Sequence, residues 1–174
     1  MRLEARSLSL SLPHSACSSP IITLIPASPS LSSPSIFRRS QDVSISSYLQ
    51  LRCNASLSTT IRWTVTRCTP ICSSAVLQLP ASIATTLSEL FLPARTLDYG
   101  TYELRLSVTM TAAPQWTSTS IAYMAIIPSP IKPNLMPLGT SVIVHGRSQD
   151  LRLDPGTNSI DPDAATFNAS VSVF

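Results

Sequence analysis

Charged side chains are scarce in this chain of 174 residues, since they make up 12% of it, against roughly 25% in an average protein. The net charge of +3 comes from scattered arginines, and Lys132 is the only lysine. Aromatic residues make up 6% and do not interleave with any basic cluster. These features argue against binding to nucleic acid. Because Ser, Thr and Pro replace the missing charge, the composition suits an extracellular protein better than a cytosolic enzyme.

Glycine, histidine and long apolar runs are also rare. Four glycines form no phosphate-binding loop, and neither His14 nor His145 has a plausible Ser and Asp partner by context. The longest apolar candidate, Ile121 to Ile127, is too short to span a bilayer. We therefore expect no enzyme activity, no cofactor and no transmembrane helix in this chain. Fifteen prolines instead favour many short extended segments.

The clearest periodic segment runs from Thr101 to Thr111, directly after an Asp-Tyr-Gly turn. Its residues alternate strictly, with the apolar face made of Tyr102, Leu104, Leu106 and Val108. This alternation predicts a half-buried strand. Gly100 followed by Tyr102 is typical of a tyrosine corner, in which the phenol packs inside and its hydroxyl bonds back to the preceding backbone.

A second pair of strands is predicted upstream. A strand that ends in Cys53 is followed by a short polar turn and by a strand that carries Trp63, which is the order found in an immunoglobulin-like core. Seven strands are expected in all: 42–46, 47–54, 60–67, 75–79, 86–92, 101–111 and 118–127. The sequence therefore predicts an all-β protein with an immunoglobulin-like or fibronectin-III-like sandwich over residues 41–128.

The flanking segments differ from this predicted sandwich. Residues 1–40 are rich in Ser and Pro and lack a periodic apolar pattern, which predicts a disordered head with only a faint likeness to a secretory signal. Residues 129–133 form a Pro-rich linker. Residues 134–174 are too few to bury a core of their own, so we expect an incomplete second β domain.

Four cysteines and two glycosylation sequons are present. Cys17 lies in the head, and we expect Cys53 to pair with Cys68 or with Cys72 in an oxidising compartment, so that one of the three stays free or pairs elsewhere. A zinc site is not expected, because the Cys68–Cys72 spacing has no second pair of ligands. Asn54 and Asn168 begin N-x-S sequons and are candidate glycosylation sites.

The segment after the linker carries a family resemblance. Its signature positions are Asp150, Leu153, Asp154, Ser159, Asp161, Pro162 and Asp163. This pattern resembles the receptor-for-egg-jelly (REJ) module and the PKD-repeat region of polycystin-1-like proteins. The preceding Leu92-Pro93, Leu97, Gly100 and Tyr102 are similar to the fibronectin-like domain of the same module. The likeness covers residues 42–163; the 164–168 segment lacks the family's Gly turn and Trp strand, and residues 1–40 match nothing in it.

The acidic part of this signature allows two interpretations. Asp154, Asn158, Asp161 and Asp163 offer hard oxygen ligands, so calcium binding is one hypothesis. The other is that Asp161-Pro162 and Pro155-Gly156 form turns in which Asp and Asn side chains bond their own backbone. The spacing fits no twelve-residue calcium loop and no bidentate Glu follows, so we favour turns and predict no metal site.

The resemblance implies a non-catalytic, extracellular part of a large multipass membrane glycoprotein linked to calcium signalling, cilia or sperm–egg recognition. Its partners would be a protein or glycan ligand outside the cell and the remaining domains of the parent receptor. It would act in ligand recognition, adhesion or force transmission at the cell surface or ciliary membrane. Two alternatives stay open: a secreted adhesion or decoy fragment, and a spliced product without a stable fold.

Overall fold

Eight strands and no helix make up the regular structure of the described residues. The computed structural model describes residues 17–53, 56–134, 144, 146–148, 150 and 159–164. The strands are β1 (Ile21–Ile25), β2 (Ser35–Arg38), β3 (Val43–Gln50), β4 (Thr59–Cys68), β5 (Cys72–Val76), β6 (Glu89–Leu92), β7 (Gly100–Met110) and β8 (Thr117–Ile127).

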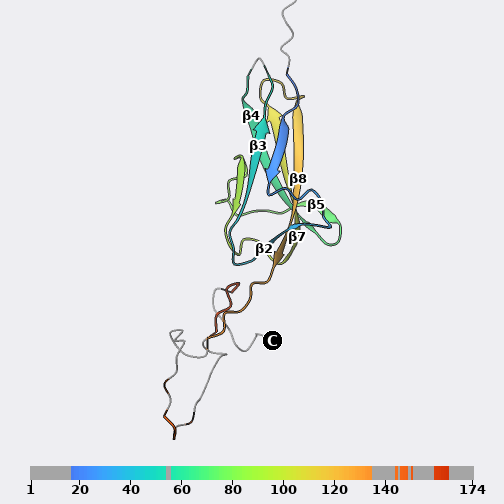
Figure 1. Ribbon diagram of the computed structural model, residues 1–174. Helices are drawn as coiled ribbons and strands as arrows, with labels where there is room; N and C mark the ends of the chain where they lie inside the picture. The colour runs from blue at the N-terminus through green and yellow to red at the C-terminus, as the bar shows by residue number, and fades with distance from the viewer. Residues whose placement is uncertain are drawn as a thin grey trace, which may run out of the picture.

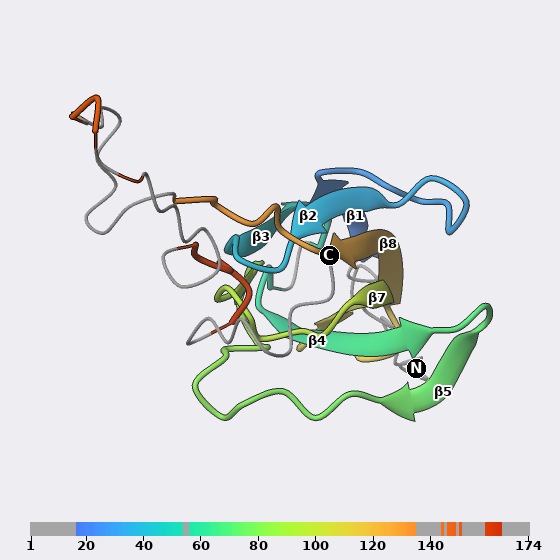
Figure 2. The same cartoon turned by 90° about the horizontal axis from the view of Figure 1, so that it is seen from below.

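The strands form two sheets that pack face to face (Figure 1). One sheet has three strands in the order β1-β3-β6, and the other has five in the order β2-β8-β7-β4-β5. All neighbours are antiparallel except β2 and β8, which are parallel. The view along the strands in Figure 2 shows β4 and β5 on one side of the molecule and β1, β2 and β3 on the other. The predicted all-β sandwich is confirmed, while its immunoglobulin-like or fibronectin-III-like type stays a prediction.

The core lies between the sheets and is built by the alternation seen in the sequence. Trp63 and Tyr102 are each 2% exposed and belong to one apolar cluster. Trp63 lies opposite Leu106 in the β4–β7 register, and its indole Nε1 donates a hydrogen bond of 2.9 Å to the Leu87 carbonyl. Because its polar atom is satisfied, the large ring is buried without an unpaired donor.

The predicted tyrosine corner is present. The Tyr102 hydroxyl donates a hydrogen bond of 2.9 Å to the carbonyl of Asp98, four residues earlier. Gly100 lies between them with φ of 145°, a conformation that L side chains rarely adopt. A Cβ at this position would also lie 3.4 Å from the Arg67 guanidinium. These constraints fix the loop that leads into β7.

The observed strands differ from the predicted ones in detail. β3 is one continuous strand where two were expected, and β5 begins three residues before the predicted strand 75–79. Within the predicted strand 86–92, only Glu89–Leu92 form a strand, β6, in which Leu90 and Leu92 point into the core. Strand ends depend on pairing partners, which local alternation does not reveal.

The head differs most from its prediction. Its described part is ordered: β1 pairs with β3, β2 pairs with β8, and Leu24 is 4% exposed within the core. The head has few apolar residues, but β1 and β2 are held in place because each pairs with a strand of the sandwich. Residues 1–16 lie outside the described part.

The cysteines also pair differently from the expectation that Cys53 joins Cys68 or Cys72. The structure pairs Cys17 with Cys53 and Cys68 with Cys72, so no cysteine is free. The antiparallel pairing of β1 with β3 places Cys17 opposite Cys53 as an isolated bridge. Cys68 and Cys72 face each other across the β4–β5 turn. Once the head is part of the sheet, the nearest partner of Cys53 is Cys17.

Candidate functional site

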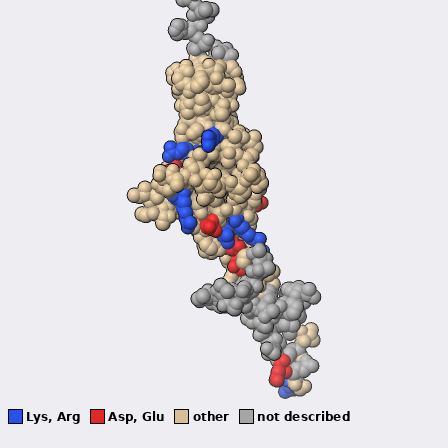
Figure 3. Space-filling view, turned by 180° about the vertical axis from the view of Figure 1, so that it is seen from behind, with Lys and Arg blue, Asp and Glu red and all other residues tan. Residues whose placement is uncertain are grey.

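The end of the sandwich where β8 finishes gathers several hydrogen bonds between segments far apart in the sequence. Figure 3 shows charged side chains gathered over the middle and lower part of one face, down to the junction with the following segment. At this end the backbone of Ile127 accepts a hydrogen bond from the Arg39 N–H (3.0 Å). The hydroxyl of Ser129 lies 2.7 Å from that of Ser40. The first residues after β8 are therefore bonded to the β2–β3 turn.

Asp163 is the centre of this region. It is only 4% exposed, and its Oδ2 accepts hydrogen bonds from the backbone N–H of Ser129 (2.6 Å) and from the hydroxyl of Tyr99 (3.0 Å). Its own N–H donates to Oδ1 of Asp161 (2.9 Å). Two loops of the sandwich and the Asp-Pro-Asp segment thus meet at one carboxylate.

Two arginines hold the backbone of the same segment. Arg95 donates from Nε and Nη2 to the Pro162 carbonyl, at 2.9 and 2.7 Å. Arg39 donates from Nη1 to the Asp163 carbonyl (3.2 Å), and its Nη2 forms an ion pair with Asp98 (3.2 Å). The Arg39 guanidinium also lies 5.3 Å from the centre of the Tyr99 ring. We call the set Arg39, Arg95, Tyr99, Ser129 and Asp161–Asp163 the clasp.

The electrostatics of the clasp favour an ionised Asp163. Burial raises the pKa of the Asp163 carboxyl, but the hydrogen bonds from Ser129 and Tyr99 and the charge of Arg39 outweigh it. The net pKa therefore lies below its ordinary value of 3.8. Burial, followed by the hydrogen bond to Asp163, raises the pKa of Tyr99, so its hydroxyl remains a donor. The ionised Asp163 carboxylate can therefore accept the hydrogen bond that the neutral Tyr99 hydroxyl donates.

A second contact joins the linker to the same segment. Lys132 and Ile160 exchange two backbone hydrogen bonds of 2.8 and 2.9 Å. The N–H of Asn134 donates to the Ser159 hydroxyl oxygen (3.3 Å). The segment 159–164 is thereby tied both to the base of the sandwich and to the Pro-rich linker.

The structure brings together only part of the predicted signature. Ser159, Asp161, Pro162 and Asp163 lie at the junction, whereas Asp150 is exposed and makes no contact in the clasp. The bond from the Asp163 N–H to Asp161 is the local bonding that the turn interpretation predicts. Leu153, Asp154, Asn158 and both sequon asparagines, Asn54 and Asn168, lie outside the described residues.

Four members of this site were not predicted from the sequence: Arg39, Arg95, Tyr99 and Ser129. Arg39 lies in the head that was expected to be disordered, and Ser129 lies in the linker. The sequence held one signal for this site, namely that Arg39 and Arg95 lie close to turns in a chain with few charged residues. No spacing rule connects residues that are 124 positions apart, as Arg39 and Asp163 are.

The described residues show neither a candidate metal cluster nor a helix that could span a membrane. Among the described residues, no group of three or more His, Cys, Asp or Glu side chains could hold a metal ion. No helix in this part of the chain is long and apolar enough to cross a bilayer.

Comparison with known proteins identifies the family. No curated protein matches the chain. The family model described as the REJ domain matches residues 47–171, which is more than half of the sequence and includes the clasp residues from Arg95 onward. REJ domains are non-catalytic extracellular modules of polycystin-like receptors, and the two disulfides fit that location. The resemblance to the REJ module is thus confirmed, and the chain belongs to the REJ domain family.

Proposed function

We propose that this chain acts as an extracellular spacer in a polycystin-like receptor, where it sets the direction of the segment that follows the sandwich and passes force along the chain. The observation that carries the proposal is the buried Asp163 carboxylate, which binds both Ser129 and Tyr99. Its partners in this role are the remaining domains of the parent receptor.

The clasp supports this role because it restrains the junction from two sides. Prolines in a linker limit its local conformations, but they leave its angle to the preceding sandwich open. Here the linker is bonded to the sandwich through Ser129 and to segment 159–164 through Lys132. The same segment is bonded to the sandwich through Arg95 and Arg39. The sandwich, the linker and segment 159–164 are therefore each bonded to the other two. Such a junction resists bending more than a single linker does.

Glycosylation belongs to the same proposal. A receptor module made in the secretory pathway would carry glycans at Asn54 and Asn168, whose sequons are intact. Mass spectrometry of the chain secreted from a eukaryotic host tests occupancy at each site.

The test of the spacer role removes the carboxylate from the clasp. In the full chain, Asp163→Ala leaves the Ser129 N–H and the Tyr99 hydroxyl without their acceptor. We expect faster hydrogen exchange at the Ser129 amide, measured by NMR, and a broader distribution of dimensions in small-angle X-ray scattering. Asp150→Ala is the matched control, because Asp150 is exposed and outside the clasp.

Two results would contradict the proposal. One is an unchanged exchange rate at Ser129, which would mean that the carboxylate does not protect this amide. The other is faster exchange with an unchanged scattering profile, which would mean that the clasp does not set the direction of the following segment.

A further inference from the structure

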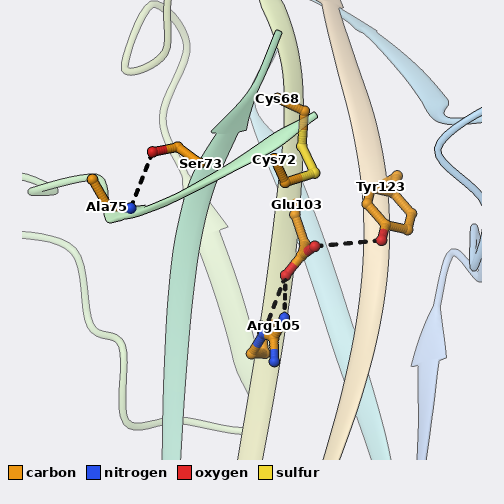
Figure 4. Close-up of a disulfide and its surroundings, with 7 residues drawn as sticks. All are labelled: Cys68, Cys72, Ser73, Ala75, Glu103, Arg105 and Tyr123. Atoms are coloured by element: carbon orange, nitrogen blue, oxygen red, sulfur yellow. Dashed lines mark hydrogen bonds and ion pairs between the residues drawn. A yellow bond between two sulfur atoms is a disulfide. The ribbon is translucent and has the colours of Figure 1, made fainter. Parts of the chain in front are cut away.

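The outer face of the five-stranded sheet has a depression beside β5. β5 pairs with β4 at Thr66–Val76 and at Cys68–Cys72, with a register shift between the two pairs. The Cys68–Cys72 disulfide anchors the start of β5 (Figure 4), and the strand is paired with β4 again only at its last residue, Val76. A hollow of about 370 Å³ opens between β5 and the side chains of Thr64, Thr66, Glu103 and Arg105.

A second hollow of about 270 Å³ continues the first one. It lies between β4 and residues 76–81, and Arg62 is among its lining residues. Thr64 and Val76 line both hollows, so the two meet there. We call the combined depression the β5 groove.

The accessible charge in the β5 groove is positive. Glu103 lies between Arg105 and Tyr123 (Figure 4), and its Oε1 accepts hydrogen bonds from Nε and Nη2 of Arg105, at 3.1 and 2.8 Å. Its Oε2 accepts one from the Tyr123 hydroxyl, at 3.3 Å. The Glu103 side chain is 9% exposed, whereas that of Arg105 is 49% exposed and Arg62 is exposed too. A ligand therefore meets two guanidinium groups and almost no carboxylate.

Two more features indicate that this surface is ready to bind a chain. The Thr66 hydroxyl oxygen is buried without a hydrogen-bond partner among the described residues. β5 is a sheet edge that contains neither a charge nor a proline, whereas β2 carries Arg38, β6 carries Glu89, and β1 is flanked by Pro20 and Pro26. Charged residues and prolines are the usual protection of an edge against pairing. β5 lacks both.

We propose that β5 and the β5 groove bind an extended acidic peptide segment of a partner protein. The segment lies along β5 in the groove, where its main chain can bond to the stretch of β5 between the two residues paired with β4, and it places carboxylates near Arg62 and Arg105. This is strand addition, in which main-chain hydrogen bonds give affinity and side-chain hollows give specificity. The inference goes beyond the spacer role, and no clasp residue lines the groove.

The experiment uses the full chain and a fluorescein-labelled synthetic peptide in which glutamate alternates with threonine. We expect saturable binding, measured by fluorescence anisotropy, that weakens as salt is added. Arg62→Gln should weaken it by about threefold, the size expected for one exposed ion pair. Arg38→Gln is the matched control, because it removes the same charge from the opposite edge of the same sheet.

A second pair of variants tests whether the peptide binds in the β5 groove. Val76 lines both hollows and is 48% exposed, so its replacement leaves the core intact. Val76→Glu should abolish binding by repelling the carboxylates, whereas Val76→Gln, of nearly the same size, should retain it. Thermal melts of all four variants confirm that they fold.

Several results would overturn the inference. They are no binding of the glutamate peptide, equal binding of a glutamine analogue, equal losses in Arg62→Gln and Arg38→Gln, or binding of a heparin oligosaccharide but not of the peptide. Because the clasp contributes nothing to this assay, failure here is distinguishable from failure of the spacer role.

Discussion

Tyr102 shows how one side chain stabilises both the core and a loop. Its ring is 2% exposed, and its hydroxyl holds the Asp98 carbonyl at 2.9 Å. The Leu97–Tyr99 loop also supplies Tyr99 to the clasp. The corner thus links the packing of the sandwich to the junction beyond it.

Replacing this hydroxyl gives the first prediction. Tyr102→Phe keeps the buried ring but removes the hydrogen bond to Asp98, so the free energy of unfolding should fall by about 1 kcal/mol. Urea denaturation measures the loss. Tyr48→Phe, at a ring that is 59% exposed, should change stability by less than about 0.5 kcal/mol. Equal effects of the two changes would contradict a special role for the corner.

The charge of Asp163 gives the second prediction, which concerns pH. Because the pKa of Asp163 is lowered in the folded chain, its ionised form stabilises the clasp above the ordinary value of 3.8. That contribution is lost as the pH falls through 3.8 and then through the lower folded pKa. The protection factor of the Ser129 amide should therefore fall in acid, relative to the protection factors of amides in β7.

Asp163→Asn is the control for this pH dependence. The amide oxygen can still accept a bond from Ser129, but it does not titrate in this range. If the variant shows the same acid-dependent loss of protection, the charge of Asp163 does not control the clasp.

At the scale of single elements, β1 and β2 decide where the folded unit begins. The REJ match starts at residue 47, inside β3, yet the core also contains Leu24, Val43 and Ile45. β1 covers one edge of β3, and β2 extends the larger sheet beside β8. The sandwich therefore includes residues that precede the family match.

A matched pair of substitutions in β1 tests this conclusion. Leu24 is 4% exposed, so Leu24→Ala should lower the free energy of unfolding by about 2–5 kcal/mol through the lost burial and the cavity. Ile21→Ala, at a side chain that is 51% exposed in the same strand, should cost under about 1 kcal/mol. Thermal melts followed by circular dichroism measure both. A negligible effect of Leu24→Ala would mean that the head is not part of the cooperative unit.

At the scale of the whole molecule, the sandwich and the clasp are separable. Among the described residues, every member of the core cluster lies between Leu24 and Ile126, and none comes from segment 159–164. The clasp, in contrast, needs Asp163 and Pro162 from that segment. Stability of the fold and rigidity of the junction thus rest on different residues.

Shortening the chain should separate the two properties. A chain that ends at Asn134 should retain a cooperative melt, because it keeps every described residue of the core cluster. Its Ser129 amide should lose protection, because its acceptor Asp163 is absent. Calorimetry and hydrogen exchange measure the two outcomes. A broad, uncooperative melt would show that segment 159–164 stabilises the sandwich itself.

The sequence by itself was sufficient for the features that depend on neighbours along the chain. Alternation at period two assigned the inward faces of β4 and β7. Gly100 followed by Tyr102 predicted the corner, and the Asp-Pro-Asp signature indicated the REJ family. Each of these signals lies within a dozen residues, where backbone geometry fixes which side chains share a face.

Only the tertiary structure decided the rest. The order of the head, the Cys17–Cys53 pair, the clasp and the β5 groove each depend on which distant segments meet. Arg39 meets Asp163 across 124 positions because β2 joins β8 and carries the β2–β3 turn to the base of the sandwich. A pattern within a strand states which side is apolar but not which strand covers it, and pairing between strands is what creates these sites.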